Sequence, residues 1–239
     1  MRSLPAARLI TLILMVTSVL GLTRNATAQG AVQAGSAAAT KPAEITITGA
    51  PIPIRILVQS PAETDAEMQI ICLFRSEPSN TLHGSLIETN EKLKGLLDLV
   101  RKPDLFRGEL GETLLLAPAT GSLGAKKLLI IGLGDSQSFT PPLMQPTGEI
   151  LYGEASRSGV AQPIFHSDRP RWRVSRFTTG DNADQVIAGF LKAAATDKVL
   201  GDAHAATGGP VTALTYLAGA KNVGNTSDGI EKAIAAAPK

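Results

Sequence analysis

The sequence has little of the material from which local catalytic or metal sites are built. Its 239 residues include one cysteine and three histidines. A single thiol cannot form an intramolecular disulfide, and Cys72, within the apolar run MQIICLF, is expected to be buried and inert. No Cys-x-x-Cys or His-Glu-x-x-His spacing occurs, so no local zinc motif is present. His83, His166 and His204 are far apart in the chain, and a zinc site made of them would depend on the fold alone. The Gly-x-Ser-x-Gly elbow of a serine hydrolase is also missing.

The N-terminus has the pattern of a secretory signal peptide. Arg2 and Arg8 are followed by an uncharged stretch at 9–23 and then by small residues at 26–28. This stretch is shorter than the roughly 20 apolar residues that cross a bilayer, and it contains hydroxyl side chains. No cysteine stands at the cleavage position to receive a lipid. We therefore expect cleavage after Ala28, no stable membrane anchor afterwards, and export to the periplasm or the exterior.

The mature chain is expected to be nearly neutral. Cleavage removes three arginines and no acidic residue, which leaves 20 basic and 21 acidic side chains. The pI of 8.7 for the whole chain therefore belongs largely to the segment that is removed. A near-neutral chain gives no support to binding of nucleic acid or of an anionic membrane surface.

The apolar patterns predict one α/β domain behind a spacer. Residues 29–43 are rich in Ala, Gln, Gly and Ser without an apolar period, which indicates a flexible Ala-rich spacer before a folded domain at 44–239. The mixture of strands and helices predicts a three-layer α/β/α sandwich with a mixed, mostly parallel sheet. The expected strands lie at 44–49, 54–60, 68–74, 112–119, 126–134, 161–167 and 211–219, and the expected helices at 82–100, at 146–159, from an N-cap at Asp181, and after a cap at Ser227.

A glycine turn follows the expected strand at 126–134. Gly132, Gly134 and Asp135 surround Leu133 there, and the backbone N–H groups of such a turn can bind a phosphate. The third glycine of a dinucleotide fingerprint is missing, and Pro141 and Pro142 stand where a phosphate-binding helix would already have begun. A tight turn required by backbone geometry is the favoured interpretation, and a ligand-binding loop is the alternative.

Arginines also cluster around the only tryptophan. In an extended segment these arginines would share one face and could bind an anionic partner. The simpler interpretation is an exposed loop or edge strand whose charges discourage pairing with another strand. If a surface patch of this chain is functional, we expect it to be this one, formed by Arg169, Arg171, Trp172, Arg173 and Arg176.

Three stretches together resemble the N-terminal domain of M17 leucyl aminopeptidases. They are GELGETLLL at 108–116, AKKLLIIGLGD at 125–135 and DQVIAGFLKAA at 184–194. The resemblance implies a macro-domain-like fold without catalytic residues. In that family, catalysis belongs to a C-terminal domain in which carboxylates and a lysine bind two divalent metal ions. The sequence stops at Lys239, before such a domain would begin.

One short segment is superficially similar to the NTDAEGR-type metal-binding segment of that family. It is NTSDG at 225–229, but its aspartate is displaced, and Glu and Arg do not follow in register. We interpret it as a turn and helix cap. No catalytic residue, metal ligand or cofactor is therefore carried over to this chain from the family.

These observations predict an exported, non-catalytic binding or regulatory module. Its partner is expected to be a full-length or split aminopeptidase, or a second copy of the chain. The alternative is an accessory part of a metallo-aminopeptidase whose catalytic half lies on another chain. A weaker alternative is binding of a nucleotide or ADP-ribose-type small molecule, which rests on analogy between folds.

Overall fold

The computed structural model describes residues 43–75, 82–102, 105–166, 177–206 and 208–237, which lie within the compact unit Lys41–Lys239. In these residues, seven strands form a sheet in the order β1-β2-β7-β6-β3-β5-β4. The five inner strands run parallel, and the edge strands β1 and β4 are antiparallel to their neighbours. The strands are β1 (Glu44–Ile47), β2 (Ile54–Leu57), β3 (Ala66–Leu73), β4 (Thr113–Leu116), β5 (Ala125–Gly132), β6 (Ile164–His166) and β7 (Leu214–Leu217).

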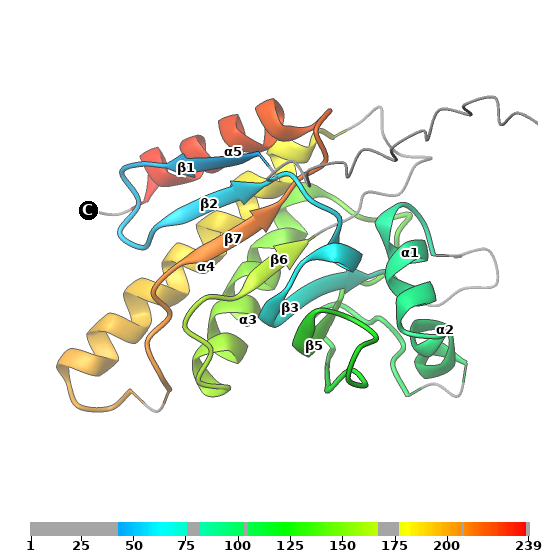
Figure 1. The fold of residues 1–239 in the computed structure, drawn as a ribbon. Coiled ribbons are helices and arrows are strands. Elements are labelled where there is room, and N and C mark those ends of the chain that lie inside the picture. The colour runs from blue at the N-terminus through cyan, green and yellow to red at the C-terminus, as the bar shows by residue number, and fades with distance from the viewer. Residues whose placement is uncertain (1–42, 76–81, 103–104, 167–176, 207, 238–239) are drawn as a thin grey trace, which may run out of the picture. The chain divides into compact units, whose positions relative to one another are not determined.

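Helices cover both faces of the sheet (Figure 1). One face packs against α3 (Met144–Arg157), α4 (Thr179–Asp202) and α5 (Val223–Ala236). The other face packs against α1 (Ser85–Lys92) and α2 (Leu96–Arg101) where β3 and β5 lie. Two short 3-10 helices, η1 (Pro61–Glu63) and η2 (Pro141–Leu143), complete the described elements. The predicted three-layer α/β/α sandwich with a mixed, mostly parallel sheet is confirmed.

The central strands are buried on both faces, as their continuous apolar runs require. Side chains alternate between the faces of a strand, so Ile70 enters the core beneath α3 to α5 and Ile71 enters the core beneath α1 and α2. Both side chains are fully buried, and each contributes about 2 kcal/mol by leaving water. Cys72 is also buried in β3, in agreement with the expectation of a core cysteine.

The single helix expected at 82–100 is two helices. Lys94 and Gly95 both have positive φ, of 55° and 81°, and this left-handed pair ends α1 and turns the chain into α2. The side chain of Asn90 supports the break, because its Oδ1 accepts a hydrogen bond from the backbone N–H of Leu97 at 2.9 Å. The apolar period at 82–100 correctly predicts which side chains are buried, but it does not predict the turn at 94–95 that divides the helix.

Two helix starts also differ from the sequence prediction. The N-cap of α4 is Thr178, and Asp181 is its partner in a capping box: Thr178 Oγ1 accepts from the Asp181 N–H at 3.0 Å, and Asp181 Oδ2 accepts from the Thr178 N–H at 2.7 Å. Helix α5 begins at Val223, one turn before the expected cap, so Ser227 lies inside it. None of the helices in the described ranges has the length and apolar character needed to span a bilayer.

Candidate functional site at the carboxyl ends of the strands

The carboxyl ends of the parallel strands define the candidate site. In open α/β sheets, ligands bind outside these ends. The loop after β5 contains the glycine turn predicted from the sequence, and the last residue of β6 is His166. The start of α1, which follows β3 in the chain, lies against His166 through Ser85. This end of the sheet, which we call the strand-end crest, therefore combines the predicted turn with a polar pair that the sequence did not indicate.

The glycine turn is bonded into the fold by its own backbone. The N–H groups of Gly132, Leu133 and Gly134 donate to the carbonyl oxygens of Glu112, Leu73 and Gly108, at distances of 2.8, 2.9 and 2.8 Å. These three amides are therefore already used and are not directed at a ligand. The structure thus agrees with the favoured interpretation, a tight turn required by backbone geometry, for Gly132 and Gly134.

Close backbone contacts explain why positions 108 and 132 are glycines. A Cβ on Gly132 would lie 2.0 Å from the carbonyl oxygen of Glu109, and a Cβ on Gly108 would lie 2.6 Å from that of Phe74. The carboxylate of Glu112 holds the loop together, since it accepts from the N–H groups of Arg107 and Glu109 at 3.1 and 3.0 Å. The most family-like stretch of the sequence therefore builds the fold.

Asp135 is a charged residue of the crest with a structural task. Its Oδ1 accepts a hydrogen bond from the N–H of Gln137 at 2.8 Å. This bond, followed by smaller contributions from Ser138 and the positive charge of Arg75, lowers the pKa of the Asp135 carboxyl below its ordinary value. Arg75 also forms an ion pair with Glu109 at 2.6 Å, and its N–H donates to the carbonyl oxygen of Gly134 at 2.8 Å, so the loop after β3 is linked to the loop before β4 and to the loop after β5.

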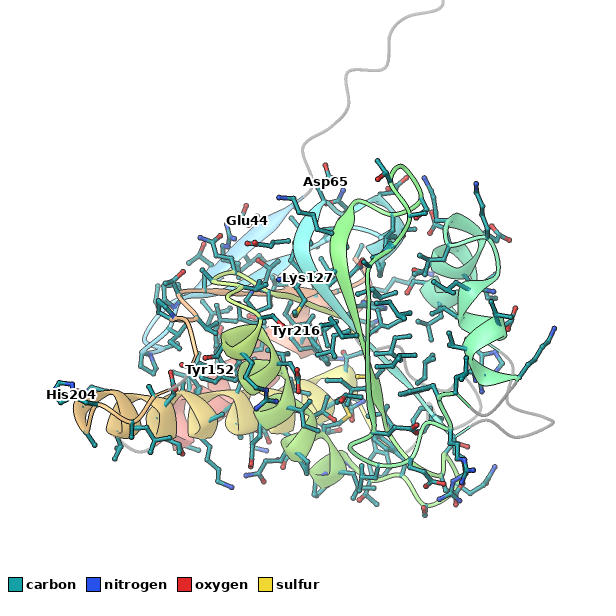
Figure 2. The ribbon with its side chains drawn as sticks, turned by 90° about the horizontal axis from the view of Figure 1, so that it is seen from below. Glu44, Asp65, Lys127, Tyr152, His204 and Tyr216 are labelled. Carbon is teal, nitrogen blue, oxygen red and sulfur yellow. The ribbon has the colours of Figure 1, made fainter. Side chains whose placement is uncertain are left out.

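Ser85 and His166 form the pair that sequence reasoning missed. The hydroxyl oxygen of Ser85 and Nε2 of His166 are 2.7 Å apart. His166 is 8% exposed, whereas Ser85 is half-buried. The two residues are 81 positions apart, and neither lies in a recognisable motif, so only the pairing of β6 with β3 could reveal them. The other histidines lie elsewhere: His204 is at the outer end of α4 (Figure 2), and His83 precedes α1.

A polar crevice of about 170 Å³ lies between the N-terminal parts of α4 and α5. Asp184 Oδ2 accepts from Lys232 Nζ at 2.7 Å, and this bond raises the pKa of the Lys232 ammonium. The residues that line this crevice include part of the segment 225–229. This segment lies within α5, so its interpretation as a turn and helix cap was wrong. In the described part of the chain, no group of three or more His, Cys, Asp and Glu side chains is placed to hold a metal ion.

The arginine patch cannot be located in the same way. Arg169, Arg171, Trp172, Arg173 and Arg176 lie outside the described residues. Its role in binding stays a prediction.

Comparison with known proteins assigns the family. Residues 70–199 match the cytosol aminopeptidase family, N-terminal domain, and the chain belongs to this family. A probable cytosol aminopeptidase of Burkholderia mallei (strain SAVP1) is 33% identical over 87 residues, which are 36% of this chain and 17% of that protein. One of Burkholderia pseudomallei (strain 668) is 32% identical over 80 residues, which are 34% of this chain and 14% of that protein. The chain therefore matches less than a fifth of the length of these curated relatives.

Solved structures show the same fold at low sequence identity. A mutant of tomato leucine aminopeptidase superposes with a TM-score of 0.52 and 17% identity, over 79% of this chain and 37% of that one. A mutant of the Oceanobacillus iheyensis macrodomain superposes with a TM-score of 0.57 and 10% identity, over 81% of this chain and 98% of that one. The macro-domain-like fold expected from the family resemblance is confirmed.

Proposed function

We propose that this chain is an exported, non-catalytic recognition module of the cytosol aminopeptidase family. It acts by surface contact with an aminopeptidase, full-length or split, or with a second copy of itself. The observation that carries the proposal is the use of the family-like stretch inside the fold. Glu112 and the amides at 132–134 hold two loops together, so these groups of the family-like stretch serve the fold.

The extent of the structural match supports this function. The superposition on the tomato enzyme takes in most of this chain but little more than a third of that one, so the likeness is to one domain of a larger enzyme. A domain whose described residues form no di-metal site can contribute to peptide hydrolysis through another chain. We therefore retain the alternative that the chain is an accessory part of a metallo-aminopeptidase. Export follows in this proposal from the sequence pattern at 1–28 and places the module in the periplasm or outside the cell.

A capture experiment tests the proposal. The mature chain, residues 29–239, is immobilised and exposed to an extract of its own cell envelope, and bound proteins are identified by mass spectrometry. The captured material is then assayed for leucine-amide hydrolysis with added Mn²⁺ or Zn²⁺. We expect a specific partner, and activity that appears only with a captured chain would identify that partner as the catalytic half. Absence of any saturable partner, together with a monomeric mature chain in solution, contradicts the module.

The arginine patch supplies a matched pair of variants. Reversing Arg171 and Arg173 to glutamate changes the charge by the same amount as reversing Lys92 and Lys102, which are exposed. We expect only the arginine variant to lose the partner, because a guanidinium pair can bind anionic groups through several donors at once. Equal retention by both variants would remove the patch from the proposal.

A second candidate function is binding of an ADP-ribose-type ligand at the strand-end crest. The favouring observation is the fold, which superposes with the Trypanosoma brucei macrodomain in complex with ADP-ribose at a TM-score of 0.51 and 12% identity. The amides of Gly132 and Gly134 are engaged within the fold, so such a ligand would have to use other groups of the crest. Isothermal titration with ADP-ribose checks this candidate, and the absence of heat at millimolar ligand would eliminate it.

A further inference from the structure

The meeting of Ser85 and His166 is produced by the sheet. Strands β6 and β3 are parallel neighbours, and His166 is in register with Ile71, close to the end of β3. The chain then enters α1 through Gly84, and Ser85 is the first residue of that helix. Two segments 81 residues apart thereby place a hydroxyl and an imidazole side by side at the strand-end crest.

The geometry is that of a nucleophile and its general base. A separation of 2.7 Å between Ser85 Oγ and His166 Nε2 lies within the hydrogen-bond reach that proton transfer needs. When Nε2 accepts the hydroxyl proton, the neutral ring carries its own proton on Nδ1. His166 is almost fully buried and held by its strand, whereas Ser85 is half-buried and can be reached from solvent.

The backbone around Ser85 also suits a nucleophile. Gly84 has φ 58° and ψ −135°, a combination that a residue with a Cβ rarely adopts, and this turn leads directly into the helix. Serine nucleophiles of hydrolases stand on comparable sharp turns before a helix. The first turn of a helix carries partial positive charge, which stabilises negative charge that develops on an attacked oxygen.

The side chains of three other serines bond to partners of a different kind. Ser122 and Ser156 donate to the backbone oxygens of Ala119 and Gly209, and Ser60 donates to the carboxylate of Glu88. Among these described serines, Ser85 is the one whose hydroxyl faces an imidazole. An imidazole can accept a hydroxyl proton as a general base, which a backbone carbonyl oxygen cannot do.

We propose that Ser85 is a nucleophile activated by His166, and that the crest catalyses hydrolysis of small carboxylic esters. Ser85 Oγ attacks the ester carbonyl carbon while its proton passes to His166 Nε2. The bond from that carbon to the leaving oxygen breaks, and the imidazolium returns the proton to the leaving alkoxide. Water then attacks the acyl-serine, with His166 accepting a proton from the water and giving it to Ser85 Oγ. The products are the alcohol and the carboxylic acid, and water is the only co-reactant. This ester hydrolysis is separate from the recognition role proposed above, in which non-catalytic means without the metal-dependent peptidase activity of the family.

The test uses a fluorophosphonate probe and p-nitrophenyl acetate on the purified chain. We expect the probe to label Ser85, as located by peptide mass spectrometry, and Ser85→Ala to lose both labelling and ester hydrolysis. His166→Gln should slow labelling by about a hundredfold or more, which is the usual contribution of a general base. Ser122→Ala and His204→Gln are the controls, because Ser122 is half-buried like Ser85, His204 is exposed, and both lie outside the pair. Both variants should behave as the parent chain.

A cysteine variant keeps the test decisive if the alanine variant is poorly folded. In Ser85→Cys the new thiol faces His166, so iodoacetamide should alkylate it at least about tenfold faster than the thiol of Ser122→Cys at the same pH. Adding His166→Gln should remove that advantage. Absence of labelling in the parent chain, unchanged hydrolysis by Ser85→Ala, or equal alkylation of the two cysteine variants would each overturn the proposal.

Discussion

Replacing Gly132 by alanine should destabilise the fold, because it forces the loop at 108–112 away from the turn at 132–134. The added Cβ would lie 2.0 Å from the carbonyl oxygen of Glu109 and 2.7 Å from the carbonyl carbon of Gly108. Both atoms belong to the backbone and cannot rotate away, so the loop at 108–112 has to move. Its movement would disrupt the bond from the Gly132 N–H to Glu112, at 2.8 Å, and the bond from the Gly111 N–H to Gly132, at 3.0 Å.

The size of the effect follows from these contacts. Overpacking at a rigid position costs about 1–3 kcal/mol, and each lost backbone bond adds about 1 kcal/mol. Since relaxation of the loop relieves part of the clash at the expense of the bonds, we expect a total loss of about 3 kcal/mol in the free energy of unfolding. With a urea slope of about 2 kcal/mol per molar, the unfolding midpoint should fall by about 1.5 M.

Urea unfolding followed by circular dichroism measures this change. Gly201→Ala is the matched control, because a Cβ there meets nothing within 4 Å and the residue lies in the last turn of α4. Alanine at that position should raise the free energy of unfolding by up to about 1 kcal/mol. A loss below about 0.5 kcal/mol for Gly132→Ala would refute the claim that this stretch exists to join the loops.

Three further predictions concern a cap, a tyrosine and the N-terminus. Thr178→Ala should lower the free energy of unfolding by about 1 kcal/mol in the same urea assay, because the capping box of α4 loses its acceptor, and an unchanged midpoint would contradict that role. Burial and the 2.8 Å bond to Asp197 raise the pKa of Tyr152 to about 12. The contribution of the neutral Tyr152 hydroxyl to the free energy of unfolding is therefore complete below pH 10 and is lost between pH 10 and about 12. Absorbance titration at 295 nm should show Tyr152→Phe removing this late step, and a step that persists would assign it elsewhere. If the chain is exported as we propose, mass spectrometry of the protein isolated from its own cells should give Gln29 as the first residue, and a chain that begins at Met1 would contradict cleavage after Ala28.

The fold class could be predicted from the sequence because the core strands are long and apolar without interruption. Runs such as 68–74 are buried on both faces in the structure, and their order with the helices already indicated the layers. Details that depend on single side chains were predicted less well. The break at Lys94 and Gly95 follows from left-handed backbone angles and a bond from Asn90, which an apolar period does not report. The sequence indicates Asp181 as the N-cap of α4, because aspartate is a favoured cap residue and Asp184 follows in the first turn, but Thr178 takes that position.

The sequence predicts only the part of the candidate site whose residues are neighbours in the chain. The glycine turn at 132–134 was found, and its favoured interpretation as a backbone device agrees with the bonds of its amides. Ser85 and His166 were not found, because no short motif joins them and their meeting depends on the order of strands in the sheet. A sequence can indicate that β3 and β6 exist, but it does not state that they are neighbours.

Metal-dependent hydrolysis of leucine amide by the purified mature chain is the most direct test of the account. Residues 29–239 are assayed with Mn²⁺ or Zn²⁺, with EDTA as the control and Ser85→Ala in parallel. We expect no metal-dependent release of leucine by this chain alone, because the family-like stretch serves the fold and no group of three or more His, Cys, Asp and Glu side chains is placed to hold a metal ion in the described ranges. Hydrolysis that requires the metal, disappears with EDTA and survives Ser85→Ala would contradict a non-catalytic recognition module.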